Sequence, residues 1–142
     1  MKRVQKFLCY MLFFVLCLGT VIPASAATNS FSGTLNFRLL DGSSNGKYYT
    51  ISANKKLTMS GSVSCKKCAS NITTPNTTYI QCFEGQASGR GETICSTTVK
   101  VGLNQVKNFS VSGTPKKTKC YMYVFKTEDD GYDLSISGTL KQ

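Results

Sequence analysis

Apolar and polar residues alternate along most of this chain, in short runs that are separated by turn residues. In the first such run Phe31, Leu35 and Phe37 share one parity, and Ser, Thr and Asn occupy the positions between them. A period of two places alternate side chains on opposite faces of a β-strand. The strands expected from this pattern are 31–39, 47–52, 57–63, 79–84, 93–101, 106–113, 119–126 and 133–141.

These strands predict an all-β fold, because no segment shows the apolar stripe of a helix. Short antiparallel strands with turn signals between them are typical of a single β-sandwich, either immunoglobulin-like or jelly-roll-like, with about seven or eight strands. Residues 27–142 suit one domain. We expect residues 64–78 to form one long loop, since they include Pro75 and no clear alternation.

The first 26 residues have the order of a secretory signal peptide. Three basic side chains lie within the first six residues, an apolar run covers 7–22, and Pro-Ala-Ser-Ala follows at 23–26. A membrane anchor is the alternative, but a spanning helix needs about 20 apolar residues. We therefore predict cleavage after Ala26, a secreted, extracellular domain over 27–142, and no integral membrane segment in it.

The chain is basic, with 17 Lys and Arg residues against 7 Asp and Glu residues. Such an excess favours an anionic surface, a cell-wall polymer or a glycan as the partner, with Lys66 and Lys67 as candidate contacts. The alternative is that scattered lysines serve only solubility. Since Lys outnumbers Arg, and since export is expected, we do not predict sequence-specific nucleic-acid binding.

Five cysteines follow the predicted cleavage site: Cys65, Cys68, Cys82, Cys95 and Cys120. In an exported protein, disulfides are the first interpretation. Cys82 and Cys95 flank a glycine-rich hairpin tip, so we expect a bridge between them, with Cys120 joined to Cys65 or Cys68. Because five is odd, one thiol remains, and a disulfide-linked dimer through it is a further expectation.

The motif Cys65-Lys66-Lys67-Cys68 also allows a redox pair or part of a zinc site. A redox pair requires its first thiol at a helix N-terminus, and the flanking residues are typical of a loop. The chain contains no His, which is the commonest general base and a common metal ligand. We therefore predict no catalytic residues, no metal, no cofactor and no enzymatic activity.

The segment 119–126 is apolar on both faces, which is typical of a central strand. Tyr121, Tyr123 and Phe125 share one face, and the three residues that alternate with them share the other. An exposed aromatic face can stack against sugar rings or bases, whereas burial of both faces would make these rings part of the core. The three aromatic residues are candidate ligand contacts.

The leading functional hypothesis is a secreted, non-enzymatic domain that binds an extracellular or cell-surface ligand, such as an anionic polymer or a glycan. The first alternative is a cationic toxin or antimicrobial factor that acts on membranes. The second is a redox or metal-binding protein that uses the two cysteines at 65 and 68.

Overall fold

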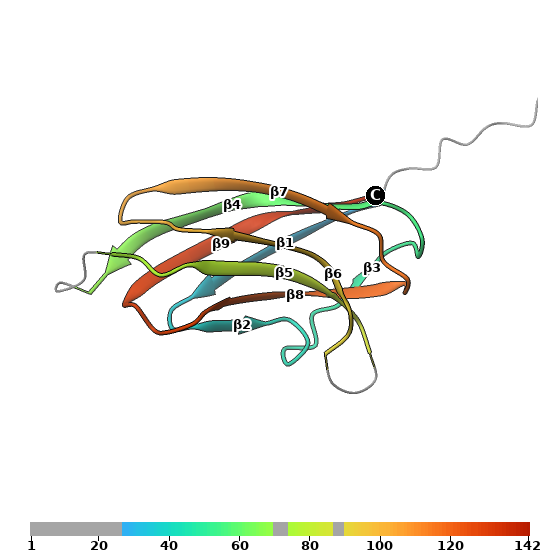
Figure 1. The fold of residues 1–142 in the computed structure, drawn as a ribbon, viewed down its shortest axis with the longest axis horizontal. Coiled ribbons are helices and arrows are strands. Elements are labelled where there is room, and N and C mark those ends of the chain that lie inside the picture. The colour runs from blue at the N-terminus through green and yellow to red at the C-terminus, as the bar shows by residue number, and fades with distance from the viewer. Residues whose placement is uncertain (1–26, 70–73, 87–89) are drawn as a thin grey trace, which may run out of the picture.

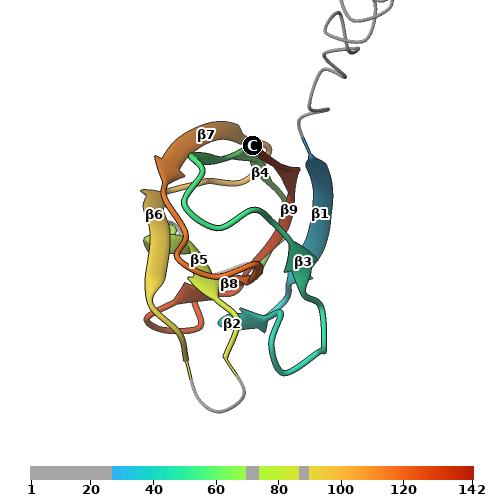
Figure 2. The ribbon, with the colours of Figure 1, turned by 90° about the vertical axis from the view of Figure 1, so that its right-hand side faces the viewer.

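The computed structural model of this chain describes residues 27–69, 74–86 and 90–142, and the predicted signal peptide lies outside these ranges. All the regular structure in them is β, arranged as two antiparallel sheets that face each other (Figure 1; Figure 2). In this part of the chain, no helix is long and apolar enough to cross a membrane.

The two sheets have four and five strands. The four-stranded sheet has the order β1 (Thr28–Leu35), β9 (Tyr132–Lys141), β4 (Leu57–Cys68), β7 (Val106–Gly113). The five-stranded sheet has the order β2 (Leu39–Asp41), β8 (Lys119–Lys126), β5 (Thr78–Glu84), β6 (Thr93–Val99), and the short β3 (Tyr49–Thr50) also pairs with β8. The chain passes between the sheets repeatedly as it runs from β1 to β9, and this order is that of a jelly roll.

The predicted β-sandwich is therefore confirmed, and the topology decides between the two kinds of sandwich that the sequence left open. The strands β7 and β8 have the bounds that the pattern predicts. The expected strand 31–39 is in fact two strands, because β1 ends at Leu35 and β2 begins at Leu39 in the other sheet.

The expected loop 64–78 is partly wrong. β4 continues through Cys68, where it still pairs with β9, and a register shift between Cys65 and Lys67 accommodates the irregular segment. Lys66 and Lys67 are both exposed, so apolar and polar residues do not alternate at this point of the strand. A bulge has this effect because it adds one residue to the strand.

The core lies between the sheets. Its members include Phe31, Met59 and Ile136 from the four-stranded sheet and Ile80 and Val124 from the five-stranded sheet. Two glycines, Gly61 and Gly138, lie opposite each other on β4 and β9. A Cβ atom on Gly138 would lie 2.6 Å from the Phe31 ring, so the missing side chain makes room for that ring.

Candidate functional site

The strand β8 separates an apolar inner face from an aromatic outer face. Met122 and Val124 are buried in the core. Tyr121, Tyr123 and Phe125 alternate with them and lie on the outer face of the five-stranded sheet, as the sequence pattern predicts. β8 is also a central strand, since β2 and β5 pair with its two edges.

The neighbouring strand β5 extends this aromatic surface. In the register of β5 with β8, Tyr79 lies opposite Phe125 and Phe83 lies opposite Tyr121. Directly opposed residues of antiparallel strands point to the same face. Tyr79 and Phe83 were not predicted as site residues, although both have the same parity in the predicted strand 79–84, which was a usable signal.

Six rings form a continuous ladder across this surface, which we call the aromatic face. Its members are Tyr79, Phe125, Tyr123, Phe83, Tyr121 and Tyr48, in order of contact. The Tyr79 and Phe125 rings stack with centroids 4.7 Å apart. The other successive centroids are 5.4 to 5.9 Å apart, within the usual range for aromatic pairs.

One end of the aromatic face is covered and the other is open. Tyr121 is only 2% exposed, and the groups close to its side chain include Gly91 and Ser43. The β2–β3 connection, which carries Ser43, projects away from the four-stranded sheet (Figure 2). Tyr123 and Phe125 are half-buried, so their rings remain accessible to a ligand.

Polar groups surround the Tyr123 ring in the middle of the face. The Arg90 guanidinium carbon lies 3.9 Å from the ring centroid, close enough for a cation–π contact. Asp41 is opposite Tyr123 on β2, and Gln81 is opposite it on β5. A carboxylate and an amide therefore flank the Tyr123 ring and a guanidinium lies over it, and together these groups can accept and donate hydrogen bonds.

Asp41 is held as a carboxylate. Its partial burial favours the neutral form, but hydrogen bonds from the side chain and backbone of Ser43, and from Ser44, outweigh this effect and lower the pKa of Asp41. At Tyr121, burial and the nearby Asp41 charge raise the pKa, which keeps that phenol neutral.

The lysines proposed as ligand contacts lie elsewhere. Lys66 and Lys67 are exposed on β4, in the four-stranded sheet. The ammonium of Lys67 lies 3.8 Å from a carboxylate oxygen of Asp133. The structure therefore brings the three predicted aromatic residues together but does not bring these lysines to them.

The five described cysteines are free thiols. Cys82 and Cys95 are directly opposite each other on β5 and β6, so the expected hairpin proximity is present, while the bridge itself stays a prediction. Cys120 lies opposite Glu84 on β5, diagonally from Cys82.

The structure does not favour the expected pairing of Cys120 with Cys65 or Cys68, which lie on strands of different sheets. Cys120 lies near the start of β8, whereas Cys68 lies opposite Tyr132, whose carbonyl accepts a hydrogen bond from Lys126 at the end of β8. Six strand residues separate these ends by about 20 Å, far beyond the reach of a disulfide. A loop at 64–78 would leave these two cysteines free to approach β8, whereas β4 continues through Cys68 and pairs there with β9.

The geometry also does not support a redox pair at Cys65 and Cys68. Both residues lie on a strand, and not at a helix N-terminus. Burial raises the pKa of Cys65, and the Cys65 thiol donates a hydrogen bond to the Lys67 carbonyl. A redox nucleophile needs the opposite shift. Among the described residues, no group of three or more His, Cys, Asp and Glu side chains is placed to hold a metal ion.

One polar interaction was not foreseen. Lys126 is 1% exposed and forms an ion pair with Asp130, which also accepts a hydrogen bond from the backbone of Asn76 at 2.7 Å. Acidic residues in a turn, such as those at 128–130, are ordinarily exposed to solvent. This pair joins the end of β8 to the turn before β9, and so it fixes the open end of the aromatic face.

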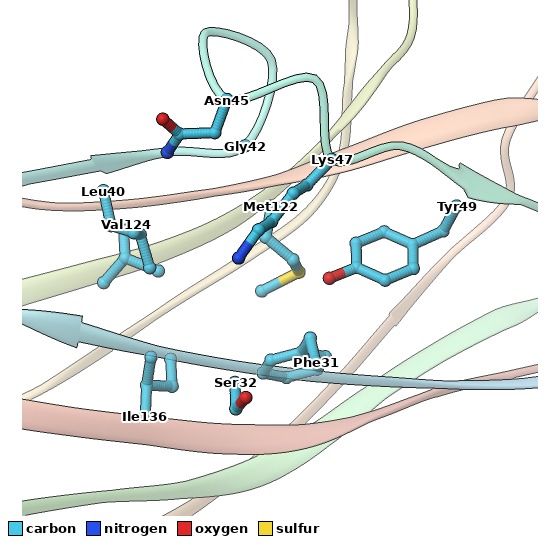
Figure 3. A pocket seen from close by; sticks show the side chains of 10 residues that line it. All are labelled: Phe31, Ser32, Leu40, Gly42, Asn45, Lys47, Tyr49, Met122, Val124 and Ile136. Carbon is cyan, nitrogen blue, oxygen red and sulfur yellow. The ribbon is translucent and has the colours of Figure 1, made fainter.

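A small cavity lies between the sheets near β1 and β2 (Figure 3). Phe31 and Ile136 from one sheet face Leu40, Met122 and Val124 from the other across it. Its volume is about 30 Å³. That is room for one or two water molecules and not for a sugar ring, so the aromatic face is the better candidate site.

No protein-family model matches this chain, and no curated protein sequence matches it. Solved structures do match. One is described as "CBM4 structure and function", with a TM-score of 0.52 and 11% identity, covering 86% of this chain and 81% of that chain.

Two further structures match less closely. A structure described as "EclA C-terminal domain; sugar-binding protein" has a TM-score of 0.49 and 10% identity, covering 87% of this chain and 82% of that chain. A structure from "Bacillus endospore appendages", described as "a novel family of disulfide-linked pili", has a TM-score of 0.44 and 12% identity, with coverages of 82% and 84%. At these identities the likeness concerns the β-sandwich fold alone.

Proposed function

We propose that this protein is an exported, non-catalytic module that binds glycans through the aromatic face. The observation that carries the proposal is the ladder of six touching rings on one outer sheet surface, half-exposed at Tyr79, Tyr123 and Phe125. A sugar ring presents C–H groups on its flat faces, and these pack against an aromatic ring while the hydroxyl groups at its rim stay polar. Tyrosine suits such contacts because its body is apolar and its tip is polar.

The groups around Tyr123 support the same ligand class. Asp41 can accept hydrogen bonds from sugar hydroxyl groups, and Arg90 can donate hydrogen bonds to sugar oxygens. A mostly apolar platform with a few fixed polar groups is the usual composition of a small-molecule site. The fold itself agrees with this assignment, because it is similar to the structure described as "CBM4 structure and function".

The basic composition favours an acidic glycan over a neutral one. The chain has 17 basic residues against 7 acidic ones, and Arg90 lies on the aromatic face itself. Long-range attraction of this kind weakens as salt screens the charges. We therefore expect binding of a polyuronate to weaken as ionic strength rises, whereas binding of a neutral glycan would change little.

Affinity electrophoresis against soluble polysaccharides, both neutral and uronate-containing, tests the proposal. Tyr123→Ala and Phe125→Ala should each weaken binding about tenfold or more, as truncation of a central aromatic anchor does. Val106→Ala is the matched control, because Val106 is 63% exposed on β7 of the other sheet. Its affinity should equal that of the wild type.

Two results would count against the proposal. One is that folded Tyr123→Ala and Phe125→Ala proteins retain wild-type affinity, and the other is that no polysaccharide of the panel binds. Release of dye from anionic vesicles would instead favour the alternative of a membrane-active factor, since a binding module should leave vesicles intact. Equal, salt-independent binding of neutral and acidic glycans would remove only the preference for acidic ligands.

A further inference from the structure

Three thiols meet inside the sandwich, beneath the covered end of the aromatic face. Cys82 on β5 lies directly opposite Cys95 on β6, and Cys120 on β8 lies diagonally from Cys82 on its other side, with all three in the core. Cys82 and Cys120 are completely buried, and Cys95 is 5% exposed. Three strands of one sheet therefore each contribute one sulfur atom to a single cluster, and the proposed glycan binding uses none of them.

We propose that these three cysteines form one oxidisable site, in which Cys82 is the shared sulfur, Cys95 is its disulfide partner, and Cys120 is the alternative partner. This inference is independent of the proposed glycan binding. It rests on the position of Cys82 on β5, between the strands that carry Cys95 and Cys120, and a simple hairpin pair would not need the third cysteine.

The register favours Cys95 over Cys120 as the partner. Directly opposed residues have the shortest Cβ–Cβ separation of an antiparallel pair, and Cys82 and Cys95 are directly opposed. Cys120 is opposite Glu84, so it lies diagonally from Cys82. The register of β5 with β6 shifts immediately after Cys82, and such a bulge lets the local backbone adjust to the geometry of a disulfide.

The pKa shifts and the exposure of the three cysteines indicate which thiol reacts first. The hydrogen bond from Cys82 lowers the pKa of Cys95 in spite of burial. Hydrogen bonds to Cys120 and Cys95, together with burial, raise the pKa of Cys82 far above its usual range. Cys95 is also the most exposed of the three. It should therefore react first as the thiolate.

The oxidant in this reaction is an external disulfide, either a small molecule or the active-site disulfide of an oxidoreductase. The Cys95 thiolate attacks one sulfur of that disulfide, which forms a mixed disulfide and releases one thiolate. Cys82 then loses its proton and attacks the Cys95 sulfur, which releases the second thiolate. Two protein thiols become one disulfide, the external disulfide becomes two thiols, and Cys120 remains reduced.

Peptide mapping of the full chain after incubation with glutathione disulfide tests this site. The expected product has lost two hydrogen atoms, links Cys82 to Cys95 and leaves Cys120 free for alkylation. The bridge should raise the thermal midpoint by about 10 °C relative to the reduced protein, because it closes a loop between two strands. A main product that links Cys65 or Cys68, or no bridge at all, would overturn the proposal.

The Cys95→Ser variant separates a shared site from a simple pair. If Cys82 is the shared sulfur, this variant should form the Cys82–Cys120 bridge, at least tenfold more slowly because both thiols are fully buried. Failure to form that bridge in the folded variant would refute the role of Cys120. Cys65→Ser is the matched control, since Cys65 is also fully buried, and its oxidation should follow that of the wild type.

Discussion

The two outer faces of this sandwich are both formed by antiparallel strands, but they carry different kinds of side chain. On the four-stranded sheet, successive rows across the strands are almost entirely hydroxyl-bearing: Ser30–Thr139–Ser60–Ser110 and Ser32–Ser137–Ser62–Asn108. On the five-stranded sheet, the corresponding rows are Leu39–Phe125–Tyr79–Thr98 and Asp41–Tyr123–Gln81–Ser96. The inner faces of both sheets are apolar and form the core.

This difference shows that the residues of the core and the residues of the candidate site occupy alternate positions of the same strands. A strand sends alternate side chains to opposite faces, so the core constrains one set of residues and leaves the other set free. The hydroxyl-bearing face has a hollow of about 400 Å³, lined by serines such as Ser32, Ser62 and Ser137. It nevertheless offers little apolar surface for stacking, so the chemistry of the side chains, and not the volume, identifies the candidate site.

The largest effect should come from the ion pair at the open end of the aromatic face. Lys126→Met leaves Asp130 buried without its partner, and we expect a loss of about 3–5 kcal/mol in the free energy of unfolding. The matched control is Lys67→Met on the other sheet, whose partner Asp133 is 33% exposed. That change should cost about 0–1 kcal/mol. Urea unfolding measures the free energy of unfolding of both variants. Equal losses would contradict the prediction that the buried ion pair contributes more than the exposed one.

The same ion pair predicts a loss of stability in acid. Burial favours the neutral form of Asp130, but hydrogen bonds from Lys126, Asn76 and Tyr132 outweigh it and lower the pKa of Asp130. A carboxyl group whose pKa is lowered on folding stabilises the protein fully above its ordinary pKa, about 3.9. This contribution is lost as the pH falls through the lower, folded-state pKa.

Thermal unfolding across the range from about pH 6 to pH 2 measures this contribution. The wild type should lose more stability than Asp130→Asn as the pH falls, because the variant has no carboxyl group to protonate at this position. If the two proteins lost stability in parallel, Asp130 would not be the group responsible. Asp41, whose pKa is also lowered, titrates in both proteins and therefore cancels in the comparison.

The sequence predicted which side chains share one face of a strand better than it predicted which strands and loops come into contact. The period of two placed Tyr121, Tyr123 and Phe125 together because alternation is a local property of one strand. It could not place Arg90 or Tyr79 beside them, since their contacts depend on which strands pair and on how a loop folds. For the same reason the burial of Asp130 was missed, because a turn of acidic residues looks solvated until its cationic partner is known.

The smallest predicted effects are the coupling energies of single pairs of opposed residues, one pair on each outer face. Tyr79 and Phe125 are opposed and stacked, and Thr58 and Ser112 are opposed with hydroxyl oxygens 3.0 Å apart. Double-mutant cycles to Ala should give a coupling of about 0.5–1.5 kcal/mol for the aromatic pair and a few tenths for the hydroxyl pair, since water replaces an exposed hydroxyl contact readily. A hydroxyl coupling as large as the aromatic one would contradict the predicted difference between the two outer faces.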